Sequence, residues 1–381
     1  MKYRTASPFF KEEDIDHVLR ETRRILSGEG LLSMGKNVDE FENLFSKYTG
    51  TKGAVATNSC TSALEIALMS IGISHGDEVI IPVQTFIATG SAVLRVGGVP
   101  VFCDVNHNYL LDFKSLKDAI TKSTKAVILV HFSGLLHEEI NEIKNYLEER
   151  NIYLIEDAAH APGASINNKK AGTFGDLSCF SFFSTKNMTT GEGGMITSDN
   201  SDLLKKCSSI RNRGIDTDNE FESFIRLGGN YRMTEFQALL GKVQLNRLDE
   251  INHKRNEIAN IYIKNLNSCF EKGLIEYPIV KDGIYHSYWR FWIRLKEGID
   301  RKCIKDSLKN ESISSDWAYD PLLHLQPLFK DNSNKSNSFS KSEELASRHI
   351  CIPIHTQIEK EDAEFISSTL SKILIKKYNE N

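Results

Sequence analysis

The sequence predicts an α/β protein in two parts: a large domain with a mostly parallel sheet and a smaller C-terminal α+β domain. Short apolar runs alternate with helical patterns from about residue 10 to residue 200. Strands that alternate with helices of about ten or more residues build parallel sheets with helices on both faces. The 381 residues also exceed the roughly 150 of a typical single domain. We therefore expect residues 1–250 to form the large domain and residues 251–381 the small one.

The elements of the large domain follow from the spacing of apolar residues. Helical spacing predicts a first helix that ends at Gly28 and a second that ends at Gly50, because glycine readily takes the positive φ that closes a helix. Further helices are expected at Thr61–Ile71 and Glu138–Arg150. Apolar runs bounded by turn residues predict strands at Gly53–Thr57, Glu78–Val83, Val99–Val105, Ala126–Phe132, Ile152–Ile155, Leu177–Phe183 and Met195–Ser198.

The pattern changes after Thr234. Apolar spacing predicts a long helix from Phe236 to Leu248, and the same spacing extends it to Ile263. A break in composition follows at Gly273. The rest of the chain has the mixed pattern of a small α+β domain, with an aromatic strand at Tyr288–Leu295, a helix at Arg301–Lys309 and a last helix from Glu359 onward.

Composition and charge exclude several classes of protein. Lysine and arginine total 47 against 51 acidic residues, so no broad basic face for a nucleic acid is expected. No apolar stretch approaches the roughly 20 residues of a membrane span, and we expect no membrane partner. Seven cysteines without a CxxC pair are typical of the cytoplasm, where we expect the protein. His131, His137 and His160 lack metal-ligand spacing, so no metal site is predicted.

Two segments at predicted strand ends are suited to bind a flat anionic ligand. Asn58–Leu64 follows a strand and opens a helix, where free N–H groups and the helix dipole favour a phosphate. Capping of the helix by Ser59 or Thr61 is the alternative explanation. Thr85–Phe86 follows another strand, and an aromatic ring there is suited to stack on a planar ligand or to pack in the core.

Two further strand ends carry charged side chains. Ile152–His160 is an apolar strand that leads into Asp157, and a buried acid requires a cationic partner such as a protonated ring nitrogen. Phe180–Asn187 leads into Lys186, and apolar surroundings lower the pKa of a lysine amine and favour Schiff-base chemistry. A helix N-cap and a solvated surface lysine are the alternatives. A phosphate, a flat ring, a basic ring nitrogen and an aldehyde carbon occur together in pyridoxal 5′-phosphate.

Several segments, some of them at these strand ends, together match the pattern of a known family. They are Leu32–Gly35 with Phe41–Glu42, Gly76–Ile80, Pro100–Val105, Glu156–His160, Phe180–Phe182, Lys186–Asn187, Gly191–Gly194 and Gly229–Glu235. Over nearly its full length the chain resembles the DegT/DnrJ/EryC1/StrS family of sugar aminotransferases. The resemblance implies pyridoxal 5′-phosphate as cofactor. It also implies the aspartate-aminotransferase-like fold, pyridoxal-phosphate fold type I, for the large domain.

The resemblance implies a role for four residues around the cofactor ring. Lys186 would hold the cofactor covalently and move the proton during catalysis. Asp157 would pair with the ring nitrogen. Phe86 would stack on the ring, and His160 would approach its 3′ oxygen.

The phosphate contacts are also implied by the resemblance. Cys60, Thr61 and Ser181 would bind the phosphate of their own subunit. Asn230 would reach the phosphate of a neighbouring subunit, so a homodimer with shared active sites is expected. The family usually has glycine where this chain has Cys60, and a backbone contact survives that change only where no positive φ is required.

The implied reaction is the transfer of an amino group from glutamate to a keto sugar, most typically a nucleotide-linked 4-keto-6-deoxy sugar, for amino-sugar and polysaccharide biosynthesis. A cyclitol or other keto-sugar transaminase and a non-catalytic pyridoxal-phosphate-binding regulator are the alternatives. A related sugar dehydratase has histidine in place of Lys186. The loop His131–His137 departs from the family pattern, which leaves its substrate contacts open. Ile313–Tyr319 with His324, and in addition His286 and Tyr288, is a candidate lining of the sugar pocket.

Overall fold

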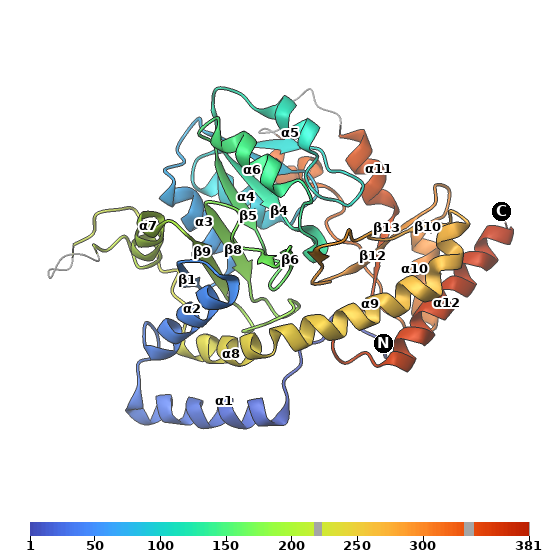
Figure 1. Ribbon diagram of the computed structural model, residues 1–381, viewed down its shortest axis with the longest axis horizontal. Helices are drawn as coiled ribbons and strands as arrows, with labels where there is room; N and C mark the ends of the chain where they lie inside the picture. The colour runs from blue at the N-terminus through green and yellow to red at the C-terminus, as the bar shows by residue number, and fades with distance from the viewer. Residues whose placement is uncertain (217–222, 331–338, 381) are drawn as a thin grey trace.

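A seven-stranded sheet forms the centre of the large part of the molecule (Figure 1). The structure is a computed structural model that describes residues 1–216, 223–330 and 339–380. In this sheet β9 runs antiparallel to both of its neighbours, and the other adjacent strands pair in parallel, which confirms the predicted α/β fold. The order across the sheet is β1 (Gly53–Thr57), β9 (Gly194–Ser198), β8 (Leu177–Ser181), β5 (Tyr153–Asp157), β4 (Thr124–Val130), β2 (Glu78–Pro82) and β3 (Val99–Cys103).

Helices cover both faces of this sheet, because alternate residues of its strands are apolar on both sides. On β4, Val127 and Leu129 enter one core, whereas Ala126 and Ile128 enter the other. The first core is completed by α2 (Lys36–Thr49), α5 (Phe113–Ala119), α6 (Ile140–Glu148) and α8 (Glu235–Asn246), and the second by α3 (Cys60–Ser70), α4 (Ile87–Arg95) and α7 (Ser201–Arg211).

One helix stands apart from this layered body. The first helix, α1 (Glu12–Arg24), lies below α8 in Figure 1 and has no buried residue. A wider helical turn continues it through residues 25–29. Leu19 and Leu26 are therefore exposed large apolar side chains in the chain by itself.

The smaller part has its own three-stranded antiparallel sheet and its own core. The long helix α9 runs from the large part into the small one (Figure 1). Tyr3, near the N-terminus, packs in the core of the small part. The domain boundary expected between residues 250 and 251 stays a prediction. Within the described residues no helix is long and apolar enough to cross a membrane. The elements are α9 (Leu248–Glu271), β10 (Ile275–Glu276), β12 (Phe291–Leu295), α10 (Arg301–Asn310), α11 (Ser340–Arg348), β13 (His349–Ile352) and α12 (Lys360–Glu380).

In two predicted elements a backbone angle interrupts the helix or strand that the apolar pattern indicated. The helix predicted from Phe236 to Ile263 is divided into α8 and α9, because Arg247 has ψ near −2° and interrupts the helical backbone. The strand predicted from Tyr288 begins only at Phe291. Tyr288 has a φ of 45°, and this left-handed backbone cannot continue a strand.

The topology brings the carboxyl ends of β1, β2, β4, β5 and β8 to the same edge of the sheet. Pairing of Val130 with Asp157 aligns the last residues of β4 and β5, and Asp157 pairs in turn with Cys179 inside β8. Ligands of open α/β sheets bind at this edge. The strand ends selected by the sequence analysis therefore lie close together.

A cluster of aromatic rings holds α2 against the sheet next to this edge. The ring of Phe45 lies 4.9 Å from that of Phe180 and 5.5 Å from that of Phe182, in edge-to-face geometry. Phe41 lies 5.4 Å from Phe182. All four side chains are fully buried, so the cluster fixes the end of β8 from which the chain continues to Lys186.

We predict that Phe45→Ala lowers the free energy of unfolding by about 3–5 kcal/mol, because it opens a cavity in a fully buried aromatic cluster. Chemical denaturation of the purified variant measures this loss. Leu44→Ala is the matched control, since Leu44 is the preceding residue of α2 but is 37% exposed, and it should change stability by less than about 0.5 kcal/mol. Equal losses in the two variants would contradict the packing described here.

Candidate active site

The two acids at the end of β5 point to opposite sides of the sheet, as successive residues of a strand must. The Glu156 carboxylate is fully buried and accepts hydrogen bonds from the N–H groups of Gly172, Phe174 and Gly175 at 2.8–3.0 Å. It also accepts the Ser178 hydroxyl at 2.7 Å. Sequence reasoning gave Glu156 no role, because its partners come from a segment that approaches only in the folded chain.

Glu156 also lies 2.8 Å from Nε2 of the buried His131, which directly follows β4. Burial by itself raises the pKa of Glu156, but the hydrogen bond to His131 and those to the backbone bring it down to about 2. This carboxylate therefore stays ionised across the physiological range. It fixes the end of β5 to its neighbouring strand and to the segment before β8.

Asp157 points toward α4, where it accepts the Thr89 hydroxyl at 2.8 Å through Oδ2. Its Oδ1 accepts the Ala159 N–H at 3.2 Å. Burial raises the pKa of Asp157, and these hydrogen bonds only partly offset the effect. No ion pair to a side chain compensates it within the described residues, so the site favours a cationic ligand next to this carboxylate.

The N-terminus of α3 forms the second side of the site. Ser59 caps the helix by accepting the Ser62 N–H at 3.1 Å, which leaves the first amides, those of Cys60 and Thr61, for another acceptor. Gly194 lies against this end, and a Cβ at Gly194 would come within 2.5 Å of the Ser59 carbonyl. Cys60 is the first residue of the helix, so the departure from the family's glycine is compatible with the local backbone.

Lys186 reaches the same space from the segment after β8. Its Nζ lies 4.1 Å from the centre of the Trp289 ring, and burial lowers its pKa to about 8. The charge of Asp157 acts in the opposite direction and raises it. The next residue is anchored from the other side, because the Asn187 amide donates to Asn252 Oδ1 at 2.8 Å and to the Ser287 carbonyl at 2.6 Å.

A stack of rings lies next to the lysine. His160 is parallel to Trp289 with ring centres 3.8 Å apart, and its Nε2 lies 2.8 Å from the Tyr319 hydroxyl. Its Nδ1 has no partner within the described residues. Burial lowers the pKa of His160 well below its usual value, so the ring is neutral. Phe86, at the N-cap of α4, is 53% exposed, and its ring centre lies 5.9 Å from that of Tyr319.

The structure thus brings most of the predicted residues to one place. Burial raises the pKa of Cys60, and the charges of Asp157 and Lys186 act on it as well, so the three groups are near one another. Ser181 is buried at the end of β8. Asn230 differs: its side chain is exposed, and its carbonyl lies 3.5 Å from the Asn58 amide nitrogen.

Several residues of this site were missed or left open by sequence reasoning. Thr89 gave no signal beyond its helical position. The aromatic run around Trp289 predicted a strand packed on both faces. The only signal for a site was that Trp289 has polar neighbours in the sequence. Tyr319 was only a candidate for the sugar pocket, and the structure places it against His160. Arg290, with its guanidinium 4.7 Å from the Trp289 ring centre and 3.3 Å from Asp316, belongs to the same group.

Comparison with known proteins agrees with this geometry. The sequence pattern of the DegT/DnrJ/EryC1/StrS aminotransferase family matches residues 12–371. The chain belongs to this family. It is an aminotransferase that depends on pyridoxal 5′-phosphate, the cofactor predicted from the four strand ends.

Its relatives are aminotransferases that act on sugars. The chain is 35% identical to the GDP-perosamine synthase of Vibrio cholerae over 325 residues, which is 84% of this chain and 86% of that protein. It is 32% identical to the UDP-4-amino-4,6-dideoxy-N-acetyl-β-L-altrosamine transaminase of Campylobacter jejuni, over 96% of this chain and 97% of that one. Among solved structures, Helicobacter pylori PseC, an aminotransferase of pseudoaminic acid biosynthesis, matches with a TM-score of 0.90 at 26% identity, over 98% and 99% of the two chains.

We predict that Glu156→Gln lowers the free energy of unfolding at neutral pH by about 2–4 kcal/mol, because an amide cannot accept the whole set of hydrogen bonds. Since the pKa of Glu156 is lowered in the folded state, its contribution is complete above about pH 4.5 and declines as the pH falls toward 2. The difference between the variant and the wild type should therefore shrink in acid. Glu148→Gln, on the exposed end of α6, is the control and should match the wild type.

We also predict that Lys186 of the cofactor-free protein reacts with pyridoxal 5′-phosphate faster as the pH rises through about 8, the pKa that burial gives its amine. The rate should grow about tenfold between pH 7 and pH 9 and then level off, because the neutral amine is the reactive form. Borohydride trapping and peptide mass spectrometry measure it. Lys186→Ala should give no adduct at this peptide. A rate that still rises steeply above pH 10 would indicate an ordinary solvated lysine.

Proposed function

We propose that this protein transfers the amino group of glutamate to a nucleotide-linked 4-keto-6-deoxy sugar. The observation that carries the proposal is a lysine of lowered pKa next to a buried aspartate that has no salt bridge among the described residues, at the carboxyl edge of a mostly parallel sheet. Relatives named for GDP- and UDP-linked amino sugars support the nucleotide-linked acceptor. We also propose the cytoplasm as the place of this reaction, since free buried thiols such as Cys103 stay reduced there.

The residues present fit the cofactor at each of its polar groups. The Asp157 carboxylate, which has no cationic side chain in a salt bridge with it among the described residues, would hold the ring nitrogen in its protonated form. The amides of Cys60 and Thr61, with the Ser181 hydroxyl, would bind the phosphate at the start of α3. Phe86 would stack on one face of the ring. When bound, the cofactor supplies the electron-withdrawing ring that makes the α-proton of glutamate acidic.

Within this arrangement Lys186 acts as the general base and acid. Its Nζ, of which about a tenth is neutral at pH 7 because burial lowers the pKa to about 8, takes the α-proton of glutamate. It would then give a proton to the carbon of the cofactor that carries the amino group after the glutamate half of the reaction. The same Nζ performs both transfers in reverse order when the keto sugar replaces 2-oxoglutarate.

Three rings near Lys186 position this reaction. Trp289 donates its Nε1–H to the Thr185 carbonyl at 3.0 Å, which fixes the indole beside the amine. His160 stacks on that indole and would approach the 3′ oxygen of the cofactor, as a neutral ring held through Tyr319. The group therefore keeps the lysine directed toward the site.

We further propose that the active unit is a homodimer with shared sites. Large apolar side chains stay exposed in the single chain, and Leu227 reaches 84% exposure close to Asn230. Phe183, which lies between Ser181 and Lys186, is also exposed, so the apolar surface adjoins the site. Association of two chains would bury this surface. The exposed large apolar side chains include Leu19, Leu26, Leu31, Leu32, Phe183, Ile225 and Leu227.

The direct test is turnover of a panel of nucleotide-linked keto sugars with glutamate, with the mass of the sugar product as readout. We predict amination of a 4-keto-6-deoxy nucleotide sugar. Lys186→Ala should lose at least about 10²–10⁴ in rate, because general acid–base catalysis contributes that much. Asp157→Asn should also be nearly inactive while it stays folded. Amination of cyclitol ketones alone, or no turnover with any ketone, would refute the proposed acceptor.

A mixing experiment tests the shared site. Lys186→Ala lacks the reactive amine, and Asn230→Asp would place a negative charge next to the partner's phosphate, so each homodimer should be inactive. We predict that refolding the two variants together restores about a quarter of the wild-type activity, because each hybrid dimer contains one site in which both residues are native. Lack of recovery, with hybrid dimers confirmed by mass spectrometry, would show that each chain completes its own site.

A further inference from the structure

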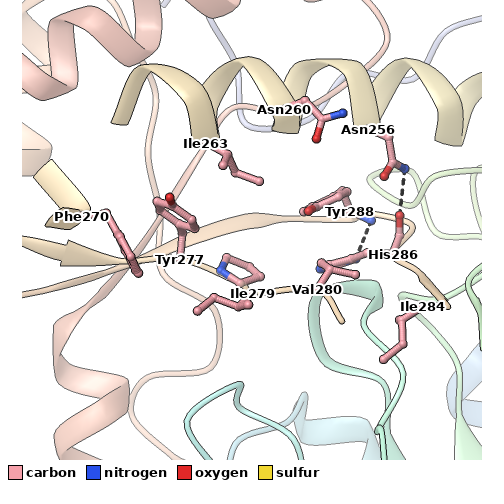
Figure 2. Close-up of a pocket in the computed structure, with 11 residues that line it drawn as sticks. Asn256, Asn260, Ile263, Phe270, Tyr277, Ile279, Val280, Ile284, His286 and Tyr288 are labelled. Atoms are coloured by element: carbon pink, nitrogen blue, oxygen red, sulfur yellow. Dashed lines mark hydrogen bonds between the residues drawn. The ribbon is translucent and has the colours of Figure 1, made fainter. Parts of the chain in front are cut away.

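A second cavity lies between α9 and the segment that leads into β12, outside the active site. Its volume is about 470 Å³, within the 300–1,000 Å³ of typical small-molecule sites. In Figure 2, Phe270 and Tyr277 lie at one end, His286 and Tyr288 lie at the other, and Asn260 projects from α9 above. The cavity therefore has a pair of rings from a separate part of the chain at each end.

The segment 286–289 separates this cavity from the active site. Trp289 packs against Lys186 and His160, whereas Tyr288 lines the cavity. The φ of 45° at Tyr288 turns the chain between the two residues. Tyr288 and His286 are stacked with ring centres 3.9 Å apart and planes 10° from parallel. The sugar-pocket role considered for His286 and Tyr288 is therefore not supported, since these rings face another cavity.

His286 contributes a buried donor without an acceptor. Its Nδ1 accepts the Tyr288 N–H at 2.9 Å, so the ring proton is on Nε2. His286 is 1% exposed, and Nε2 has no hydrogen-bond partner within the described residues. The Gly134 carbonyl is near enough to raise the pKa of the His286 ring, but it makes no hydrogen bond of accepted geometry with Nε2 and already accepts the Ser287 N–H and hydroxyl, at 3.2 and 3.3 Å. Burial lowers the pKa of His286 to about 3, so the ring is neutral and has one N–H to donate.

The remaining lining defines what the cavity accepts. None of its lining residues is charged: apart from His286, they are aromatic, aliphatic or amide side chains and one proline. The Asn256 amide is occupied by the carbonyls of Asn252 and His286, both at 2.9 Å, which keeps this wall in place. Such a lining disfavours a charged group inside and favours a flat ring between aromatic side chains.

We propose that this cavity binds a neutral nucleobase, whose carbonyl or ring-nitrogen acceptor takes the proton of His286 Nε2 and whose ring packs between the two aromatic pairs. The base belongs either to a free nucleoside or to a nucleotide whose phosphates remain outside the uncharged cavity. Both sources share the same recognition chemistry. The site is separate from the cofactor, and its occupation requires no turnover.

Calorimetric titration of the cofactor-loaded enzyme with uridine and with guanosine tests the proposal. At least one of the two should bind with one site per subunit. His286→Phe keeps the flat ring but removes the N–H, and it should weaken binding by about tenfold or more. His286→Gln, which supplies an amide N–H, should recover part of the affinity. The glutamate half-reaction should stay unchanged in these variants, so failure of the proposed transamination would be seen separately.

A second pair of variants guards against loss of folding at the buried His286. Asn260→Trp places a large ring at the exposed rim of the cavity on α9 and should block the nucleoside. Asn267→Trp, at an exposed position of the same helix outside the cavity, is the matched control and should bind like the wild type. Competition by UDP or GDP would identify a nucleotide as the occupant, and lack of competition a free nucleoside. No binding of either nucleoside, or binding that survives both His286→Phe and Asn260→Trp, would overturn the proposal.

Discussion

The buried carboxylate of Glu156 is the constraint on which the geometry of the site depends. It is fully ionised in the interior, and five donors from three segments compensate it. Because those donors lie on one side of the sheet, the neighbouring Asp157 must point to the other side, toward α4. The hydrogen bonds that stabilise the Glu156 carboxylate thus also fix the direction of the Asp157 side chain.

The same sheet supplies the rest of the site by a simple rule. Parallel strands end at one edge, and the chain leaves each strand there with its first loop residues free of pairing. The start of α3, the turn before α4, the end of β5 and the segment after β8 therefore meet without any direct relation in sequence. Gly194, the first residue of β9, packs directly against the start of α3 and so holds that helix end next to the other strand ends.

Burial then determines the chemical state of each group. It lowers the pKa of Lys186 to about 8, so the amine is partly neutral at physiological pH. It raises the pKa of Asp157, so the charged carboxylate requires a nearby cation to be stable. His160 and His286 are neutral for the same reason. Nε2 of His286, however, has no hydrogen-bond partner in the part of the chain that the structure describes, whereas Nε2 of His160 lies 2.8 Å from the Tyr319 hydroxyl.

The α/β class and most strand positions were predictable from the sequence, because apolar periodicity is a local property. Strand-end chemistry pointed in the same way to Lys186, Asp157, Phe86 and the start of α3, whereas His160 and Ser181 were expected only from the family resemblance. The partners of Glu156, the contacts of Thr89 and Tyr319, and the break between α8 and α9 were not predictable. Each depends on which distant segments meet, or on a backbone angle such as that of Tyr288, which apolar spacing does not encode. The sequence by itself determined which chemical groups stand at the strand ends. Only the tertiary structure decided their directions and pKa values, because burial and hydrogen bonding arise when the segments pack together.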